Sequence, residues 1–587
     1  MTEYIPTPQI AILDTGGQYT HLIARKVREL GVYAEVLPSE VPVSRLKGRK
    51  GVIISGGPAS VYEPGSPTVD PALFDAGFPV LGICYGQQLM AYALGGTVQK
   101  GDRGEYGAAY LEQKGQTRLL QGTAPRQRIW MSHRDSVSAL PSGFELVGAT
   151  ETCAVAAISN ESRGLFGVQF HPEVVHTEFG RQILSNFAFD ICGCTVDWEP
   201  RQRIPLVEQH IREVVGDRNV FFFVSGGVDS TVAFTLCLHA LGEQRVSGAY
   251  VDTGFMRQGE TEYVRNLFTS LGSKHFQIVD ASSQFIGAVA QSCDPESKRR
   301  AIGEEFVKVQ EAVLQTGHFL DGHWILGQGT IYPDTIESGG TSKAEVIKTH
   351  HNRVAGIQKL IDEGKIVEPL HFFYKDEVRE IGRELGLSQE FLDRHPFPGP
   401  GLAIRCLCSD EELDVERIEE GWILPIRSVG VQGDSRTYRP VLAIDQHNDH
   451  LYATSLTNRL ASVNRVVSVL GSKHPLESMR VRRRTLSEER LALLREADAI
   501  VRRICNETGF EHRIWQFPVV LVPLGSDEAR DSIVLRPVES VDGMTAQSVE
   551  LGHELRDRFT TELLALAGVA AVFHDLTHKP PATIEWE

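Results

Sequence analysis

Short apolar runs, separated by stretches of helical periodicity, are the main pattern over the first two thirds of the chain. Residues 220–224 are the clearest case, because all five are apolar and either β-branched or aromatic, which predicts a strand buried on both faces. A helical pattern follows from Asp229 and ends at Gly242. This alternation predicts parallel α/β sheets. Further strands are expected at residues 9–14, 51–55, 80–84, 246–251 and 324–327.

The last third of the chain has a different pattern, in which β-type runs recur. Residues 424–438 and 517–524 begin two similar successions of such runs, and we interpret the two as copies of one β-rich module. Between them, Thr485 and Glu488 have the spacing of a capping box and precede a periodic apolar stretch. A helix is therefore expected to join the two copies.

The length of 587 residues is enough for three or four domains of ordinary size. The charged, proline-containing residues 197–203 are a plausible boundary. We expect a multidomain α/β protein with two α/β domains followed by two tandem α+β modules. The expected domains are residues 7–195, 201–405, 406–480 and 481–587.

Composition narrows the class of protein. A net charge of −17 argues against a general nucleic-acid binder and against a membrane-surface protein. No run approaches the ~18 apolar residues of a membrane span, and the N-terminus lacks a signal pattern, so a cytoplasmic protein is expected. Nine scattered cysteines do not resemble a disulfide framework. The pairs Cys192/Cys194 and Cys406/Cys408 lack the usual zinc spacing, and we predict no metal site.

The segment between the 220–224 strand and its helix has the features of a phosphate cradle. Its glycines allow main-chain N–H groups to face an anion, and the helix N-terminus adds partial positive charge. It lacks the spacing and the lysine of a Walker loop. A glycine turn without a ligand is the alternative. The candidate phosphate-binding residues are Ser225, Gly226, Gly227, Val228, Asp229 and Ser230.

A second chemical motif lies at residues 82–86, where Cys84 is flanked by glycine at both second neighbours. This is the form of a nucleophile elbow, a tight strand-to-helix turn that places a thiolate at a helix N-terminus. Downstream, His171 and Glu173 stand two residues apart at a strand end, hence on the same side. One can act as a base while the other orients it.

Cys84, His171 and Glu173 in these contexts resemble the triad of the class I glutamine amidotransferases, and residues 7 to about 192 are similar to that family throughout. The resemblance implies that the cysteine attacks the glutamine amide, the histidine protonates the departing ammonia and the glutamate holds the imidazole. It also implies that the N–H groups of Gly57 and Tyr85 form the oxyanion hole.

Ser-Gly-Gly-Val-Asp-Ser at 225–230 resembles the loop of the ATP pyrophosphatase family, which splits ATP between its α and β phosphates. AMP and pyrophosphate, not ADP, are then the expected products. Residues 328–338, 347–352 and 394–405 look specifically like the GMP synthetase family. That resemblance implies Mg²⁺ with ATP, and a role for Lys348 at the ATP phosphates.

The same resemblance assigns a site for xanthosine monophosphate (XMP). The doubled module is similar to the long, eukaryotic-type form of the family, and residues 579–587 resemble its XMP-binding tail. A disordered chain end is the alternative for the tail, and a solvated basic helix start is the alternative for Arg299. The residues implied to contact XMP are Arg299, Asp434, Gln516, Lys579 and Glu585.

The resemblance therefore implies an enzyme that makes GMP from XMP, ATP and glutamine. Another amidotransferase-coupled ATP pyrophosphatase, such as an NAD synthetase, is the second hypothesis, and a catalytically silent regulatory protein is the third. Because two module copies can satisfy each other within one chain, we expect a monomer or a weak homodimer. The apolar runs at 424–431 and 517–524 are expected to face each other.

Overall fold

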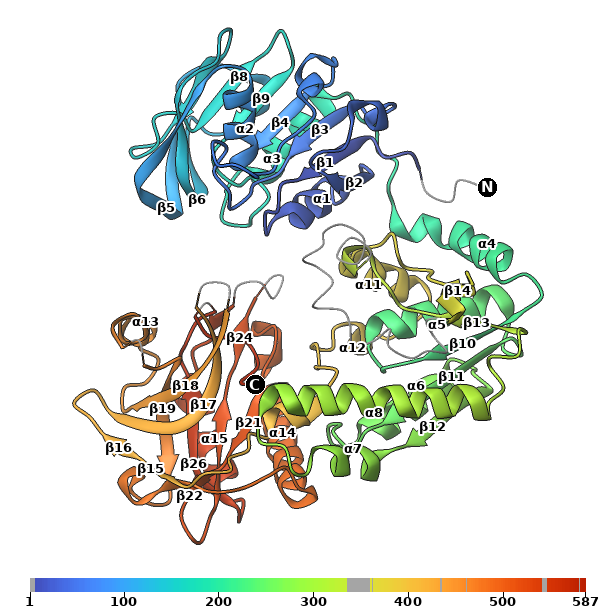
Figure 1. Cartoon of the computed structure of the whole chain (residues 1–587), viewed down its shortest axis with the longest axis vertical. Coiled ribbons are helices and arrows are strands. Elements are labelled where there is room, and N and C mark those ends of the chain that lie inside the picture. Colours follow the sequence, from blue (N-terminus) through green and yellow to red (C-terminus); the bar gives the residue numbers. More distant parts are fainter. Residues whose placement is uncertain are drawn as a thin grey trace. The chain divides into compact units, whose positions relative to one another are not determined.

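The computed structural model describes residues 6–334, 359–361, 363–432, 435–460, 462–540, 546–579 and 581–587 (Figure 1). Lys348 and Asp434 lie outside the described residues. The chain divides into two compact units. Unit 1 comprises Met1–His210, Ile331–Glu345 and His371–Ile381, and unit 2 comprises Ile211–Thr330, Val346–Leu370 and Gly382–Glu587. No helix among the described residues is long and apolar enough to cross a membrane.

Unit 1 is built on a nine-stranded sheet with the order β2-β1-β3-β4-β9-β8-β7-β5-β6. The first five strands in this order are parallel, and the remaining pairs are antiparallel. Expected strands at 9–14, 51–55 and 80–84 are confirmed as β1, β3 and β4. The strands are β1 (Ile10–Asp14), β2 (Ala34–Pro38), β3 (Gly51–Ile54), β4 (Val80–Ile83), β5 (Thr97–Gln113), β6 (Arg126–Ala139), β7 (Glu145–Ala149), β8 (Ala157–Asn160) and β9 (Leu165–Val168).

Helices cover the parallel part of this sheet, and β5 and β6 extend from it as a long ribbon (Figure 1). Two apolar clusters, each containing sheet residues such as Ile12 and Leu13, form the core of unit 1. The α-helices are α1 (Thr20–Arg28), α2 (Tyr85–Ala93) and α3 (Gly180–Ser185), the last continued by a π-helix at Asn186–Ile191. The core therefore fixes the end of β4, where Cys84 lies.

Arg28 on α1 connects two distant segments of unit 1. Its buried guanidinium lies 4.5–5.1 Å from four aromatic ring centres, donates to the Phe372 carbonyl at 2.7 Å and lies 3.4 Å from a Glu377 carboxylate oxygen. A buried cation without such partners would be costly, so these contacts hold the later segments in place. The four rings belong to Tyr33, Trp198, Tyr332 and Tyr374.

The first sheet of unit 2 has five parallel strands in the order β12-β11-β10-β13-β14. Expected strands at 220–224, 246–251 and 324–327 are confirmed as β10, β11 and β13. The strands are β10 (Asn219–Phe223), β11 (Val246–Asp252), β12 (His275–Asp280), β13 (Trp324–Gly327) and β14 (Ile366–Val367). The α-helices of unit 2 here are α5 (Val228–Leu241), α6 (Glu260–Ser270), α7 (Ser282–Val289), α8 (Pro295–Thr316) and α12 (Gln389–Leu392). The boundary between the two units divides α4 (Ile204–Val215) and α11 (Lys375–Glu384).

The second large sheet of unit 2 has seven strands in the order β16-β17-β18-β19-β26-β23-β21. Its strands are β16 (Glu416–Arg417), β17 (Trp422–Gln432), β18 (Ser435–Ile444), β19 (Arg465–Ser472), β21 (Val519–Val522), β23 (Asp531–Leu535) and β26 (Val569–Asp575). Its helices are α13 (His450–Arg459), α14 (Glu488–Thr508) and α15 (His553–Leu564). Smaller sheets hold β15 (Leu413–Asp414), β20 (Arg480–Val481), β22 (Leu524–Gly525), β24 (Val538–Glu539) and β25 (Gln547–Ser548).

This sheet consists of two halves with the same topology. Each half is an antiparallel pair, then a helix, then a strand parallel to the second of the pair: β17-β18-α13-β19 and β21-β23-α15-β26. The halves meet where β19 pairs antiparallel with β26. This repeated order agrees with the interpretation of two module copies, while the boundaries at 406–480 and 481–587 stay a prediction.

Two local expectations were wrong. The runs at 424–431 and 517–524 are not neighbours, because β17 and β21 lie toward opposite ends of the sheet, and the halves join edge to edge instead. The expected helix between the copies is confirmed as α14, but its N-cap is Ser487, whose hydroxyl accepts from the Arg490 N–H at 3.3 Å. Thr485 does not form the cap, because Ser487 is the last residue with extended backbone before the helix.

Candidate functional site

Cys84 occupies a strained turn between β4 and α2. Its backbone angles are φ 54° and ψ −107°, a conformation that non-glycine residues rarely adopt. The turn is tight because Gly86 lies against the main chain of Ile54, where a Cβ would come within 2.3 Å of the carbonyl oxygen. The backbone therefore has the form of the predicted nucleophile elbow.

The structure brings the three predicted triad residues together. His171 Nδ1 lies 2.7 Å from Glu173 Oε1, and the Cys84 sulfur is near enough to the His171 ring to raise its pKa. All three side chains are buried. Burial favours the neutral imidazole, but the Glu173 carboxylate and the Cys84 sulfur outweigh it and raise the pKa of His171 to about 10. The ring is therefore held as an imidazolium at neutral pH.

The predicted oxyanion donors lie on two segments beside the triad. A Cβ placed at Gly56 would lie 3.0 Å from His171 Cε1 and 3.5 Å from Cys84 Cβ, so the Gly56–Gly57 main chain borders the nucleophile. The Thr15 hydroxyl fixes this loop by donating to the Gly56 carbonyl at 2.8 Å. Tyr85 is the first residue of α2, where a main-chain N–H has no acceptor within the helix.

Sequence reasoning missed two side chains next to the triad. Gln169 Nε2 lies 3.6 Å from Cys84 Sγ, and the Tyr19 ring contacts the His171 ring edge-on with centres 5.1 Å apart. Gln169 could have been found, because it is a lone amide between apolar neighbours at the end of β9. Tyr19 has no such signal, since its approach depends on how α1 packs.

The predicted phosphate loop follows β10 and opens α5. Ser225 Oγ lies 3.2 Å from Ser230 Oγ and accepts from the Gly227 N–H at 3.3 Å, so side chains hold the loop curved. Asp229 is in the first turn of α5, where a carboxylate suits the helix dipole. The loop thus has the expected strand-loop-helix context.

This loop lies at the point where the strand order reverses. The chain proceeds from β10 outward to β12, then returns to the other side of β10 with β13. Open α/β sheets bind ligands at the carboxyl ends of strands at such a point. The loop after β13 reaches the same place, because a Cβ at Gly329 would lie 2.8 Å from the Ser230 main chain.

Two of the residues implied to contact XMP, Arg299 and Glu585, form contacts at the C-terminal tail. The Arg299 guanidinium donates to the Glu587 carbonyl, and Lys298 Nζ lies 2.6 Å from the Glu587 carboxylate. Arg405 donates two hydrogen bonds to Glu585, at 2.9 and 2.7 Å. The tail is therefore ordered against α8 and the segment at 401–405 rather than frayed.

The other two described candidates lie on segments near the small sheet of β24 and β25. Gln516 Nε2 donates to the Pro396 carbonyl at 2.7 Å, and its main chain forms a bridge with Val538 on β24. Lys579 pairs through its main chain with Ala546, just before β25. All five XMP assignments stay predictions.

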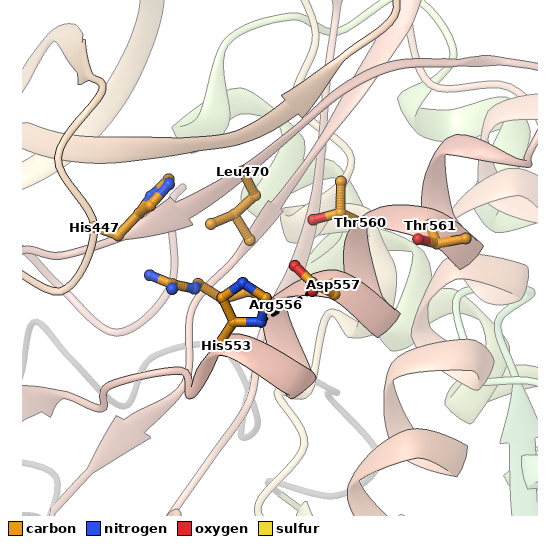
Figure 2. Close-up of a pocket in the computed structure, with 7 residues that line it drawn as sticks. All are labelled: His447, Leu470, His553, Arg556, Asp557, Thr560 and Thr561. Carbon is orange, nitrogen blue, oxygen red and sulfur yellow. Dashed lines mark ion pairs between the residues drawn. The ribbon is translucent and has the colours of Figure 1, made fainter.

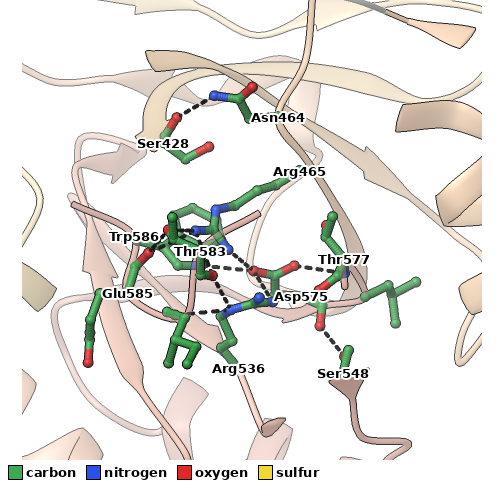
Figure 3. Close-up of polar contacts among 12 residues, drawn as sticks. Ser428, Asn464, Arg465, Arg536, Ser548, Asp575, Thr577, Thr583, Glu585 and Trp586 are labelled. Atoms are coloured by element: carbon green, nitrogen blue, oxygen red, sulfur yellow. Dashed lines mark hydrogen bonds and ion pairs between the residues drawn. The ribbon is translucent and has the colours of Figure 1, made fainter. Parts of the chain in front are cut away.

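A buried ionic group anchors the tail (Figure 3). Asp575 accepts from Arg465 and Arg536, each at 2.9 Å, and from the Trp586 indole at 2.9 Å. Burial disfavours the Asp575 carboxylate, yet the two guanidiniums hold its pKa below the usual range. Trp586 itself is fully buried. The tail is thus part of the core of unit 2.

A cavity of about 360 Å³ lies elsewhere in unit 2, between β19 and α15 (Figure 2). It contains no predicted site residue. His553 Nδ1 lies 3.0 Å from a carboxylate oxygen of Asp557. The lining residues are His447, Leu470, His553, Arg556, Asp557, Thr560 and Thr561.

Family comparisons cover both chemical sites. Residues 11–191 match the model "Glutamine amidotransferase class-I", residues 201–334 match "NAD synthase", and residues 503–586 match "GMP synthase C terminal domain". A protein of Leptospira interrogans named "Probable GMP synthase (glutamine-hydrolyzing)" is 43% identical over 99% of both chains. The GMP synthase of Streptomyces coelicolor is 40% identical over 98% of both chains.

The chain belongs to the glutamine-hydrolysing GMP synthase family. The predicted fold class is confirmed, with a class I amidotransferase domain, an ATP pyrophosphatase domain and a GMP synthase C-terminal region. The family also decides between the enzymatic hypotheses. An NAD synthase model matches only residues 201–334, whereas the GMP synthases match nearly the whole chain.

Proposed function

We propose that this chain forms GMP from XMP, with ATP as the activating substrate and glutamine as the nitrogen donor. The buried Cys84–His171–Glu173 triad is the observation that carries the proposal, since it supplies a nucleophile, a proton donor and an orienting carboxylate in one place. The phosphate loop at 225–230 supplies a separate site in unit 2. One unit then releases ammonia and the other consumes it.

In the first half-reaction, Cys84 Sγ attacks the side-chain amide carbon of glutamine. The oxyanion that develops is stabilised by the N–H groups of Gly57 and Tyr85. His171 gives its proton to the departing nitrogen, the C–N bond breaks, and ammonia leaves a thioester on Cys84. Water then hydrolyses the thioester to glutamate. Glu173 keeps the His171 ring oriented throughout.

In the second half-reaction, O2 of XMP attacks the α-phosphorus of ATP and pyrophosphate leaves. The loop at 225–230 supports this step by offering N–H groups and the Ser225 and Ser230 hydroxyls to the leaving group. Ammonia then attacks C2 of the purine, the C–O bond breaks and AMP departs. The products are GMP, AMP and pyrophosphate.

Asp229, beside the loop in the first turn of α5, would hold Mg²⁺ bound to the triphosphate, because this ion prefers hard oxygen donors such as a carboxylate. When bound, the ion neutralises charge on the triphosphate.

The XMP site is proposed at the C-terminal tail. Arg299 Nε is buried and has no hydrogen-bond partner among the described residues, so its N–H can donate to an anionic group such as the nucleotide phosphate. Glu585 and Lys579 stand on the tail itself, and Gln516 borders the small sheet.

A single substitution tests the division of labour. Cys84→Ala should lower glutamine-driven GMP formation by about 1,000-fold or more, yet leave formation from ammonium salts intact. Cys192→Ala, which removes another thiol of unit 1, is the matched control. Pyrophosphate release should equal GMP formation. Equal loss with both nitrogen donors, or ADP as a product, would contradict the proposal.

A further inference from the structure

A second cluster of reactive side chains lies beside the triad in unit 1. Glu105 on β5, His133 on β6 and Cys153 after β7 each place one potential metal-ligating atom within 4.8 Å of the other two. His133 and Cys153 are buried, and Glu105 is half-buried. The three come from separate segments, so no sequence spacing reveals them.

The hydrogen bonds of His133 determine which nitrogen faces the cluster. Nδ1 lies 3.0 Å from the Asp135 carbonyl oxygen, which can only accept, so Nδ1 carries a hydrogen. Nε2 then points at the Glu105 carboxylate, with 3.2 Å between Nε2 and Oε2. Two lone pairs at that distance repel each other unless a cation or a proton lies between them.

Cys153, the third side chain of the cluster, favours a metal ion over a proton as the cation between His133 and Glu105. A proton between Nε2 and the Glu105 oxygen would leave the buried Cys153 thiol without a part in the cluster. A metal ion would use all three, because sulfur, imidazole and carboxylate are together the ligands of zinc-class ions. Tetrahedral zinc places its ligand atoms roughly 3.3–3.8 Å apart, so a contraction of about 1 Å would suffice.

We propose that Glu105, His133 and Cys153 bind a zinc-class divalent cation and leave its fourth position open. The outer contacts fit such a site. The Asp135 carbonyl fixes the His133 tautomer, and the Thr152 hydroxyl donates to the other Glu105 oxygen. Ligating histidines and carboxylates generally have such supporting partners.

Occupancy of this site would act on the nucleophile through β6. Ser132, next to His133, has its carbonyl oxygen 3.6 Å from Cys84 Sγ, and the Trp130 carbonyl accepts from the His171 N–H at 3.0 Å. A cation that pulls His133 toward Cys153 moves the strand that contacts both catalytic residues. Zinc therefore inhibits glutamine hydrolysis, a consequence that rests on the proposed function, whereas the binding itself does not.

Binding is tested with Co²⁺ on the full chain, in a Cys84→Ser background that removes the catalytic thiol. One equivalent of Co²⁺ should produce a thiolate-to-cobalt charge-transfer band. Cys153→Ser should abolish the band, and Glu105→Gln, at a half-buried position, should weaken binding at least tenfold. Cys192→Ser is the matched control and should change neither. A band that survives Cys153→Ser, or no band in the background protein, overturns the site and leaves a plain His133–Glu105 ion pair.

The consequence is tested by titrating Zn²⁺ into glutamine hydrolysis and ammonia-driven synthesis in parallel. Glutamine hydrolysis should fall in the wild type, and Cys153→Ser should need at least tenfold more zinc for the same fractional loss. Ammonia-driven synthesis should be unaffected. Equal zinc sensitivity of the wild type and Cys153→Ser would overturn the regulatory role. Absence of ammonia-driven synthesis before zinc is added would count against the proposed function, not against the metal site.

Discussion

His171 is the residue whose charge state decides the chemistry of unit 1. Burial alone would make it neutral, yet Glu173 and Cys84 hold the pKa at about 10. An imidazolium can protonate departing ammonia, and a neutral ring cannot. The acid in the proposed mechanism is therefore created by its neighbours rather than by the histidine itself.

Replacing Glu173 by glutamine should lower the pKa of His171, because the attraction that raises it disappears while burial remains. In the wild type, the high-pH loss of glutamine hydrolysis should come near pH 10. In Glu173→Gln it should move down by about one pH unit or more, and the neutral-pH rate should fall roughly 100- to 10,000-fold. The measurement is kcat against pH. Glu145→Gln, exposed at the start of β7, is the control, and an unmoved high-pH limb would refute the assignment.

Residues with a local signature were predictable, and residues recruited by folding were not. Cys84, His171 and Glu173 stand in motifs that dictate an elbow and a shared strand end, and the structure brings them together. Tyr19 and the Glu105–His133–Cys153 cluster depend on contacts between segments far apart in sequence. No window of sequence contains that information.

Among the elements, the C-terminal tail is the clearest case of order that composition does not predict. Chain ends are usually frayed. Here the buried indole of Trp586 donates to Asp575 on β26, and Glu585 pairs with Arg405, so contacts with two other segments of unit 2 fix the tail. The tail can therefore present side chains to a ligand without first being ordered by it.

Removal of residues 579–587 should raise the XMP concentration needed for half-maximal synthesis at least about tenfold, with little change for glutamine, because the triad is in the other unit. Trp586→Ala should act in the same direction, since burial of the indole holds the tail down. Steady-state kinetics with each substrate varied in turn is the measurement. Trp586→Phe is the conservative control. An unchanged XMP requirement in the truncated protein would show that the tail has no role in binding.

The Asp575 anchor of the tail allows a test of how burial changes the contribution of an ion pair to stability. Asp575→Ala leaves Arg465 and Arg536 buried without their carboxylate, and a buried pair broken on one side typically costs about 3–5 kcal/mol. Asp527→Ala removes an ion pair of similar length with Arg482, but Asp527 is 93% exposed, so about 0–1 kcal/mol is expected. Calorimetry on the full-length variants measures both. Similar losses for the two would contradict this account of the anchor.

The capping of α14 shows why element ends are less predictable than elements. Thr485 and Ser487 both carry a hydroxyl group, and the periodic apolar stretch that follows suits either. The choice depends on where the backbone leaves the extended conformation, at Ser487, because a cap must precede helical geometry directly. Sequence therefore predicted the helix and not its first residue.

For the whole molecule, repetition was predictable and the joint between the repeats was not. Both halves of the seven-stranded sheet repeat the same order of elements, as the paired successions of β-type runs indicate. The apolar runs at 424–431 and 517–524 begin the two copies, and they were expected to face each other. The two halves are instead joined by pairing between β19 and β26. No pattern in the sequence identifies these two strands as the ones that join.

This joint leads to a prediction about assembly. A sheet with the antiparallel β19–β26 pair at its centre has already used, within one chain, the edges that two single-copy chains could pair. The remaining edges are poor templates, because β16 has only two residues and β21 is bridged at Leu521 by Cys406. We expect a monomer of 64.9 kDa at nanomolar concentration without nucleotide. Sedimentation equilibrium with and without XMP measures this, and a dimer that persists at nanomolar protein without XMP would show that another surface of the chain makes a strong interface.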